Sequence, residues 1–250
     1  MKYGKCFLTA ILALTAAAPV LQAADIYAVQ GDVLYAADPA DGEWTALTES
    51  WSGTELITSC SGHLFAIQGD VLYRIDPSTG EWENISDTWE GSNALAAGSG
   101  KLYAHQNGTV YEIDPSSGEW SSLDQNPDGI SLMTWAGGSL MAVGGSTLYR
   151  IDPDSGEYVS LPSSYSGTTA IAGDGNKLVV VQGDVMYKVD PDTGDYENLG
   201  GGYSGATELA VRGNYAYCIW EGALWKTDLT TGEYQSLGSS WAGTTAMCIM

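Results

Sequence analysis

Basic residues are scarce in this sequence of 250 residues. Lysine and arginine together number 9 against 31 aspartates and glutamates, which gives a net charge of −22 at pH 7. A surface of this charge repels phosphate backbones and anionic lipid headgroups. We therefore expect no nucleic-acid partner, and we interpret the charge as that of a soluble, acidic surface rather than of a dedicated cation-binding protein.

Long apolar runs are missing after the first residues. Segment 1–23 has a basic start at Lys2 and Lys5, an apolar stretch over 7–18 and a Leu-Gln-Ala ending, which is typical of a secretory signal peptide. No later segment approaches the roughly 20 apolar residues of a transmembrane helix. The sequence therefore predicts a signal peptide over 1–23, a mature protein over 24–250 that is secreted or periplasmic, and no membrane insertion.

Cysteine and histidine are too few for a disulfide framework or an evident catalytic constellation. Once Cys6 leaves with the signal peptide, three cysteines remain: Cys60, Cys218 and Cys248. This odd, sparse set predicts buried, unreactive thiols. The histidines, His63 and His105, occupy different repeat positions, and neither lies near a nucleophile motif. We therefore predict no catalytic residues, no metal ligands and no cofactor.

One phrase returns along the whole sequence every 38 residues. Residues 71–82 read Val-Leu-Tyr-Arg-Ile-Asp-Pro-Ser-Thr-Gly-Glu-Trp, and the aromatic residue at the third position recurs without any insertion. Its occurrences are Tyr35, Tyr73, Tyr111, Tyr149, Tyr187 and Trp225. A constant period of this length is the mark of a repeat architecture.

Each repeat contains four short segments rich in β-forming residues, joined by turn sequences. In the third repeat they are 93–98, 101–106, 109–114 and 119–123. The third segment is apolar or aromatic on both faces, so both faces of each small sheet must be covered. Radial packing of blades achieves this. We therefore predict an all-β, six-bladed β-propeller with four-stranded antiparallel blades, in preference to an open solenoid.

The two ends of the mature sequence predict how the ring closes. Residues 25–30 correspond to a second strand without a first strand before it, whereas 245–250 correspond to a first strand without a second strand after it. We expect the C-terminal inner strand to pair with the N-terminal second strand, so that the two ends complete one blade.

The Asp-Pro turn, as in 76–80, is the most regular motif. Aspartate accepts backbone N–H groups of the turn, proline presets φ, and glycine takes the left-handed conformation. Its spacing is not that of a twelve-residue calcium loop. We interpret this turn as part of the scaffold.

The link to each next blade carries an aromatic residue, one variable residue and glycine, except where Pro127 replaces the aromatic. The link aromatics are Trp51, Trp89, Tyr165, Tyr203 and Trp241. Four second strands end nearby in glutamine: Gln30, Gln68, Gln106 and Gln182. An aromatic ring with an amide beside it can stack on a sugar and hydrogen-bond its hydroxyls. Alternatively, the aromatic wedges between blades and the glutamine closes the hairpin; the residues alone leave both interpretations open.

The repeats resemble tectonin-type β-propellers. The resemblance rests on phrases such as Trp-Ala-Gly-Thr-Thr-Ala-Met at 241–247 and Lys-Leu-Val-Val-Val-Gln-Gly at 177–183. More distant similarities are to Kelch repeats, through the Asp-Pro turn, and to pyrroloquinoline-quinone-type propellers, through Asp-x-x-Thr-Gly. Tectonin-type propellers include lectins with repeated pockets between blades. The resemblance therefore implies that the five link aromatics stack on sugars and the four glutamines bind hydroxyls.

We thus expect a secreted, non-catalytic, multivalent carbohydrate-binding propeller whose partners are glycans or glycoconjugate surfaces. The alternative is a protein–protein interaction scaffold that binds another exported protein. A third hypothesis is a metal-dependent hydrolase at the central channel, where Glu55 and Asn93 are candidate ligands. The residues equivalent to them favour a hydroxyl-rich collar instead: Ser131, Thr169, Thr207 and Thr245.

Overall fold

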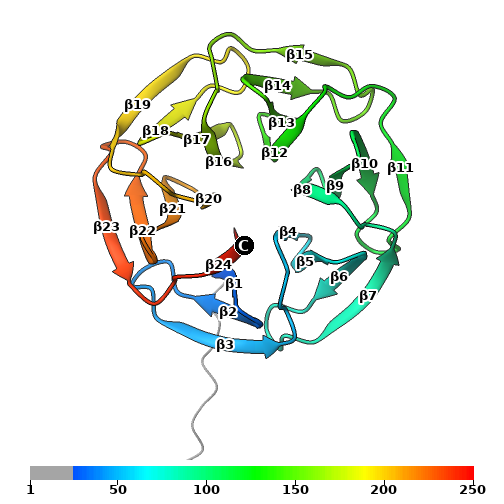
Figure 1. Cartoon of the computed structure of the whole chain (residues 1–250), viewed down its shortest axis with the longest axis horizontal. Coiled ribbons are helices and arrows are strands. Elements are labelled where there is room, and N and C mark those ends of the chain that lie inside the picture. Colours follow the sequence, from blue (N-terminus) through cyan, green and yellow to red (C-terminus); the bar gives the residue numbers. More distant parts are fainter. Residues whose placement is uncertain (1–24) are drawn as a thin grey trace, which may run out of the picture.

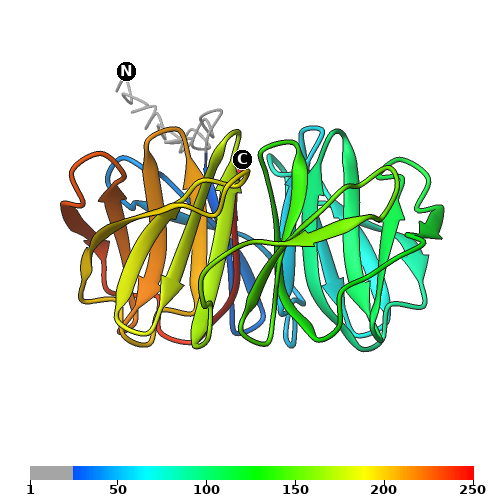
Figure 2. The same cartoon turned by 90° about the horizontal axis from the view of Figure 1, so that it is seen from above.

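The structure, a computed structural model, describes residues 25–250. The predicted signal peptide lies outside the described residues. Within this range the chain forms 24 strands and no helix, and the strands make six four-stranded sheets arranged as blades around an axis (Figure 1). Seen from the side, the blades form a ring with strands running along its thickness (Figure 2). The predicted six-bladed β-propeller is confirmed.

The strands occupy four concentric positions. The innermost are β24 (Thr244–Ile249), β4 (Leu56–Cys60), β8 (Ser92–Gly98), β12 (Ile130–Ala136), β16 (Thr168–Asp174) and β20 (Glu208–Arg212). The second are β1 (Ile26–Gln30), β5 (His63–Gln68), β9 (Lys101–Gln106), β13 (Ser139–Gly144), β17 (Lys177–Gln182) and β21 (Tyr215–Trp220). The third are β2 (Val33–Ala37), β6 (Val71–Ile75), β10 (Thr109–Ile113), β14 (Thr147–Ile151), β18 (Val185–Val189) and β22 (Ala223–Asp228). The fourth are β3 (Trp44–Glu49), β7 (Trp82–Asp87), β11 (Trp120–Ser122), β15 (Tyr158–Ser160), β19 (Tyr196–Gly201) and β23 (Tyr234–Gly238).

Blade 1 contains both ends of the described chain. Its strand order is β24-β1-β2-β3, and β24 pairs antiparallel with β1 through contacts such as Ala28 opposite Met247. Blades 2 to 6 follow in chain order, each as a meander of four consecutive strands. The predicted ring closure by the C-terminal inner strand is therefore confirmed.

The Asp-Pro turns have the expected hydrogen bonds. At Asp114, the carboxylate accepts the N–H of Ser116 at 2.8 Å and the Ser116 hydroxyl at 2.5 Å. These bonds, led by the hydroxyl, lower the pKa of Asp114 to about 2. The turn glycines have positive φ and also touch the preceding blade: a Cβ on Gly42 would lie 2.0 Å from the carbonyl oxygen of Leu237. The turn thus shapes its own blade and docks it on its neighbour.

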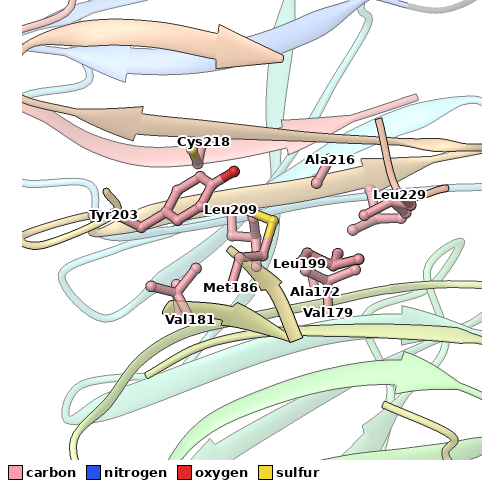
Figure 3. Packing of buried hydrophobic residues seen from close by; sticks show 13 residues of the cluster. Ala172, Val179, Val181, Met186, Leu199, Tyr203, Leu209, Ala216, Cys218 and Leu229 are labelled. Atoms are coloured by element: carbon pink, nitrogen blue, oxygen red, sulfur yellow. The ribbon is translucent and has the colours of Figure 1, made fainter. Parts of the chain in front are cut away.

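The hydrophobic core is divided among the blade boundaries, because each blade packs its two apolar faces on its two neighbours. Between blades 5 and 6, Tyr203 lies among Leu209, Met186 and Cys218 (Figure 3). Five further clusters of buried side chains repeat this arrangement around the ring. Any site between blades is consequently held by packing on both sides.

The fourth strands form the outer belt of the ring. In Figure 1 they run along the circumference, and β23 points toward the beginning of β3 in the next blade. β11 and β15 are the shortest of them, with three residues each, and in both blades the next residue still donates its N–H to the third strand, Leu123 to Val110 and Leu161 to Leu148. The belt places the first residue of each fourth strand on the outside of a blade boundary.

Candidate functional site at the blade boundaries

The five link aromatics are buried between blades. Their exposed fractions are at most 4%: Trp51, Trp89, Tyr165, Tyr203 and Trp241. The backbone explains this placement. The main-chain N–H of each link aromatic donates to a carbonyl in the turn between the second and third strands, as that of Trp51 does to Asp32 at 2.9 Å. The chain then turns back through a bond such as Thr54 N–H to Trp51 O at 3.1 Å. The ring is therefore driven inward, and its faces pack on protein.

The four glutamines meet these links, as the sequence predicts, but their amide N–H groups are occupied. In each case Nε2 donates to the two carbonyls that flank the aromatic, for example Gln68 to Ser50 at 3.0 Å and to Ser52 at 2.8 Å. The same pair of bonds recurs at Gln30, Gln106 and Gln182. The amide therefore fastens the link to the second strand, and the donor groups that a sugar would need are already used.

At every blade boundary an exposed ring packs edge-on against the aromatic residue of the third strand. At four boundaries a buried link aromatic also joins, so that an aromatic ladder leads from the core to the solvent. At the boundary of blades 1 and 2, buried Trp51 meets Tyr73 edge-on at 5.6 Å between ring centroids. Tyr73 in turn meets Trp82 at 5.2 Å, and Trp82 is 49% exposed. The predicted site residue, Trp51, is thus the buried end of the ladder. The solvent-exposed end is Trp82, the first residue of the fourth strand.

The exposed rungs recur in all six blades with exposed fractions between 40% and 59%: Trp44, Trp82, Trp120, Tyr158, Tyr196 and Tyr234. Our sequence reasoning missed them as site residues, because Trp82 appeared as an ordinary member of the repeated β-phrase. The available signal was their 38-residue spacing combined with an acidic residue directly before each ring. Those residues are Glu43, Glu81, Glu119, Glu157, Asp195 and Glu233.

The ladder varies around the ring. At the boundary of blades 3 and 4 the link carries Pro127, and only Tyr149 and Tyr158 pair, at 5.7 Å between centroids. At the boundary of blades 5 and 6, Tyr203 and Tyr234 are joined by Trp220 and Trp225, which stack on each other at 4.4 Å. The six boundaries therefore share one plan but offer different surfaces.

The boundary of blades 6 and 1 is hollowed on the outside. A cavity of about 380 Å³ is lined by nine residues: Asp41, Gly42, Glu43, Trp44, Leu237, Gly238, Ser239, Ser240 and Trp241. Predicted residues shape this cavity, since Trp241 lines it and Gln30 holds the Ser240 carbonyl at 3.0 Å. Here the structure brings together a predicted link aromatic, a predicted glutamine and an exposed tryptophan.

A second cavity of about 330 Å³ occupies the central channel, lined by the six innermost strands. Glu55 and Asn93 both line it, but Asn93 is engaged, since its Nδ2 donates to the Ile130 carbonyl at 2.9 Å. Within residues 25–250, no group of three or more His, Cys, Asp or Glu side chains is placed to hold a metal ion. Glu208, also in the channel wall, has its pKa raised to about 8 by burial.

The histidines and cysteines of residues 25–250 form no metal-binding group, although Cys60 in β4 and His63 in β5 are cross-strand partners. His63 lies at the start of β5, and its Nδ1 is 3.4 Å from the Ser61 carbonyl. His105 is buried with Nδ1 at 2.5 Å from Asn93 Oδ1, and burial lowers the pKa of its imidazole. The three cysteines of the described residues are free and buried, which confirms the predicted burial, and burial raises the pKa of Cys218 to about 12.

Comparison with known proteins supports the fold and leaves the family open. No protein-family model and no curated protein matches the sequence. The crystal structure of a nidogen/laminin complex contains a chain that matches with a TM-score of 0.77 at 11% identity, over 90% of this chain and 98% of that one. TolB from Acinetobacter baumannii matches with a TM-score of 0.70 at 17% identity, over 90% of this chain and 66% of that one. Among the described residues, no helix is long and apolar enough to cross a membrane.

Proposed function

We propose that this protein is a non-catalytic, multivalent carbohydrate-binding propeller whose sites lie at the outer ends of the blade boundaries. The observation that carries the proposal is the set of six exposed aromatic rings at equivalent positions, each supported from below by buried or half-buried aromatic residues. A ring held in this way presents a fixed apolar surface for the C–H groups of a sugar.

The link aromatics and glutamines keep an indirect role in this proposal. The ladder holds the exposed ring, and the glutamine bonds hold the link that carries the inner rung. The tectonin-type resemblance supports the same arrangement of repeated sites between blades. Segment 1–23, with its basic start and apolar stretch, supports export to the periplasm or the outside.

A single site of this kind is shallow, so we expect millimolar affinity, which corresponds to about −4 kcal/mol. A glycan array followed by titration with the best-binding sugar tests the proposal. Trp82→Ala and Trp120→Ala, each combined with Trp44→Ala, should weaken binding about five- to tenfold. Their melting temperatures should stay close to that of the wild type, because half-exposed rings contribute little to the core.

Val159→Ala provides the matched control, because Val159 is as exposed as Trp82 and lies on a fourth strand but is not aromatic. Sugar binding that survives the tryptophan substitutions, or that falls equally in the Val159 variant, contradicts the proposal. Trp51→Ala is unsuitable for this test, since removing a fully buried ring destabilises the fold.

The second candidate is a protein-interaction scaffold, with which the propeller fold is compatible. One matching structure is of a nidogen/laminin complex, and exposed aromatic residues are also enriched in protein interfaces. Affinity capture from the exported protein fraction separates the two functions. A specific protein that binds the wild type but not the Trp44/Trp82/Trp120 triple alanine variant, together with a blank glycan array, favours the scaffold.

A further inference from the structure

The cavity at the boundary of blades 6 and 1 has a carboxylate at a turn position where the other five blades have serine or threonine. In the corresponding turns of the other five blades, a serine or threonine hydroxyl accepts the N–H of the residue two positions later at 3.2 Å: Thr79, Ser117, Ser155, Thr193 and Thr231. In the first blade this position is Asp41, whose Oδ1 accepts the Glu43 N–H at 2.9 Å. Asp41 therefore performs the same turn function with one oxygen and adds a negative charge at a position that is uncharged in the other five turns.

This charge lies where a ligand has room. Asp41 and Glu43 line the cavity of about 380 Å³ together with Trp44, which is 50% exposed, and with Ser239 and Ser240. No lysine or arginine is among the cavity's lining residues in the described chain. Lys226 reaches the turn that contains Asp41, but its Nζ donates to the Pro39 carbonyl at 3.0 Å and lies 4.4 Å from the centre of the Tyr215 ring. Among the described residues it forms no salt bridge with Asp41 or Glu43.

We propose that this cavity binds a hexosamine with a free, protonated amino group. The inference rests on the proposed carbohydrate-binding function and names the sugar class of one of its sites. Trp44 stacks on the sugar ring, the serine hydroxyls bond its hydroxyls, and the carboxylates of Asp41 and Glu43 attract the ammonium group. The indole face adds to that attraction, because an aromatic ring favours a nearby cation.

The repeats offer an internal comparison for this preference. Glu81 and Trp82 at the boundary of blades 1 and 2 correspond to Glu43 and Trp44, but Thr79 stands in place of Asp41. The attraction due to the shared glutamate is therefore common to both boundaries. Only the part of the preference for the amino sugar at Trp44 that exceeds the preference at Trp82 is due to Asp41.

Two-dimensional NMR of the indole N–H groups reads each boundary separately, with the Trp44 and Trp82 signals assigned from Trp44→Phe and Trp82→Phe. The probes are a glucosamine trisaccharide and its fully N-acetylated form, titrated where the free amine is protonated. At Trp44 we expect the amine form to bind about three- to tenfold more tightly than the acetylated form. At Trp82 the ratio should be smaller, and added salt should reduce the difference because it screens exposed charges.

Asp41→Thr places at position 41 the residue found at the equivalent position 79, so the turn should persist. An unchanged melting curve would show this. In this variant the ratio of the affinities for the amine and acetylated sugars, measured at Trp44, should fall to the ratio measured at Trp82. The reciprocal change, Thr79→Asp, should raise the ratio at Trp82 to the wild-type value at Trp44.

Two outcomes overturn the inference in distinguishable ways. If both sugars shift Trp44 and Trp82 with the same ratio, or if Asp41→Thr leaves the ratio unchanged, the amine preference is wrong while sugar binding at the boundaries stands. If neither these sugars nor the best sugar from the array shifts any exposed indole, both the inference and the proposed function fail.

Discussion

Two equivalent link tyrosines differ in the bonding of their buried hydroxyls. The Tyr203 hydroxyl lies 3.0 Å from Thr227 Oγ1, and both residues are fully buried. The Tyr165 hydroxyl is buried and has no hydrogen-bond partner among residues 25–250, and the residue equivalent to Thr227 in its neighbouring blade is Val189. An unpaired buried hydroxyl is costly, whereas a paired one is roughly neutral or favourable.

This difference predicts opposite results for the same substitution. Tyr203→Phe should lower the free energy of unfolding by about 1–2 kcal/mol, because it leaves the Thr227 hydroxyl unpaired. Tyr165→Phe should leave it unchanged or raise it, since it removes an unpaired hydroxyl. Urea denaturation of the two variants provides the measurement. In a Val189→Thr background, Tyr165→Phe should lower the free energy of unfolding as Tyr203→Phe does in the wild type. Equal losses of stability in Tyr203→Phe and Tyr165→Phe would show that the hydrogen bond to Thr227 does not cause the difference.

The candidate site shows where sequence reasoning stops at the level of single residues. The spacing correctly predicted that Gln68 and its equivalents meet the links. It did not predict that Trp51 is buried and Trp82 exposed, because both are aromatic residues in short apolar phrases. Their burial depends on the adjacent blade and on how far the fourth strand turns along the circumference, neither of which is encoded by local spacing.

At the level of strands, prediction from the sequence is far more complete. Turn chemistry and the absence of insertions determine four strands per repeat, and even a cross-strand pair such as Arg74 opposite Glu83 follows from the register. The exception is the fourth strand, which shortens to three residues in β11 and β15. Local β-propensity cannot show this, since pairing there ends where the chain must leave for the next blade.

Glu208 is an exception among the innermost strands. Its equivalents are all apolar: Leu56, Ala94, Leu132, Ala170 and Ala246. Glu208 lies in β20 and accepts a backbone hydrogen bond from Met247 in the closing strand β24, which lowers the pKa of its carboxyl, but burial dominates and raises it from 4.5 to about 8. Burial in the channel wall therefore outweighs the hydrogen bond from Met247, and the folded protein favours a protonated carboxyl.

The sign of the resulting pH dependence follows from proton uptake. Between about pH 4.5 and pH 8 the folded protein holds a proton on Glu208 that the unfolded chain releases, so this group's contribution to stability falls as pH rises through that range. Glu208→Gln keeps an acceptor for the Met247 N–H but cannot ionise. At pH 9 it should raise the free energy of unfolding by roughly 1–3 kcal/mol.

Thermal or urea unfolding of wild type and Glu208→Gln at pH 5 and pH 9 measures this effect. Other buried acids, such as Asp25, whose pKa is also raised by burial, are present in both proteins and cancel in the difference. The gain in free energy of unfolding of Glu208→Gln over the wild type should be markedly smaller at pH 5 than at pH 9. A difference that is the same at both pH values would mean that ionisation of buried Glu208 does not destabilise the folded protein.

On the scale of the whole molecule, the fourth strands run around the circumference (Figure 1). Each begins with one of the six exposed aromatic residues. Sites that face outward from a ring cannot all meet one flat surface, so a glycan-coated surface engages neighbouring boundaries on one arc. Weak sites then gain strength only when adjacent sites bind together, because the second contact forms at a high effective concentration. Adjacency, and not only the number of sites, should therefore determine surface binding.

Two triple alanine variants separate adjacency from number. Substituting Trp44, Trp82 and Trp120 leaves the contiguous arc of Tyr158, Tyr196 and Tyr234, whereas substituting Trp44, Trp120 and Tyr196 leaves three exposed rings that are never neighbours. We expect the contiguous variant to bind an immobilised glycan surface about tenfold or more tightly than the alternating one, measured by surface plasmon resonance. Because the alternating variant keeps a tryptophan, single-site strength favours the opposite order. Equal binding, or tighter binding by the alternating variant, would show that the boundaries act independently, and titration with a monovalent sugar controls for losses at individual sites.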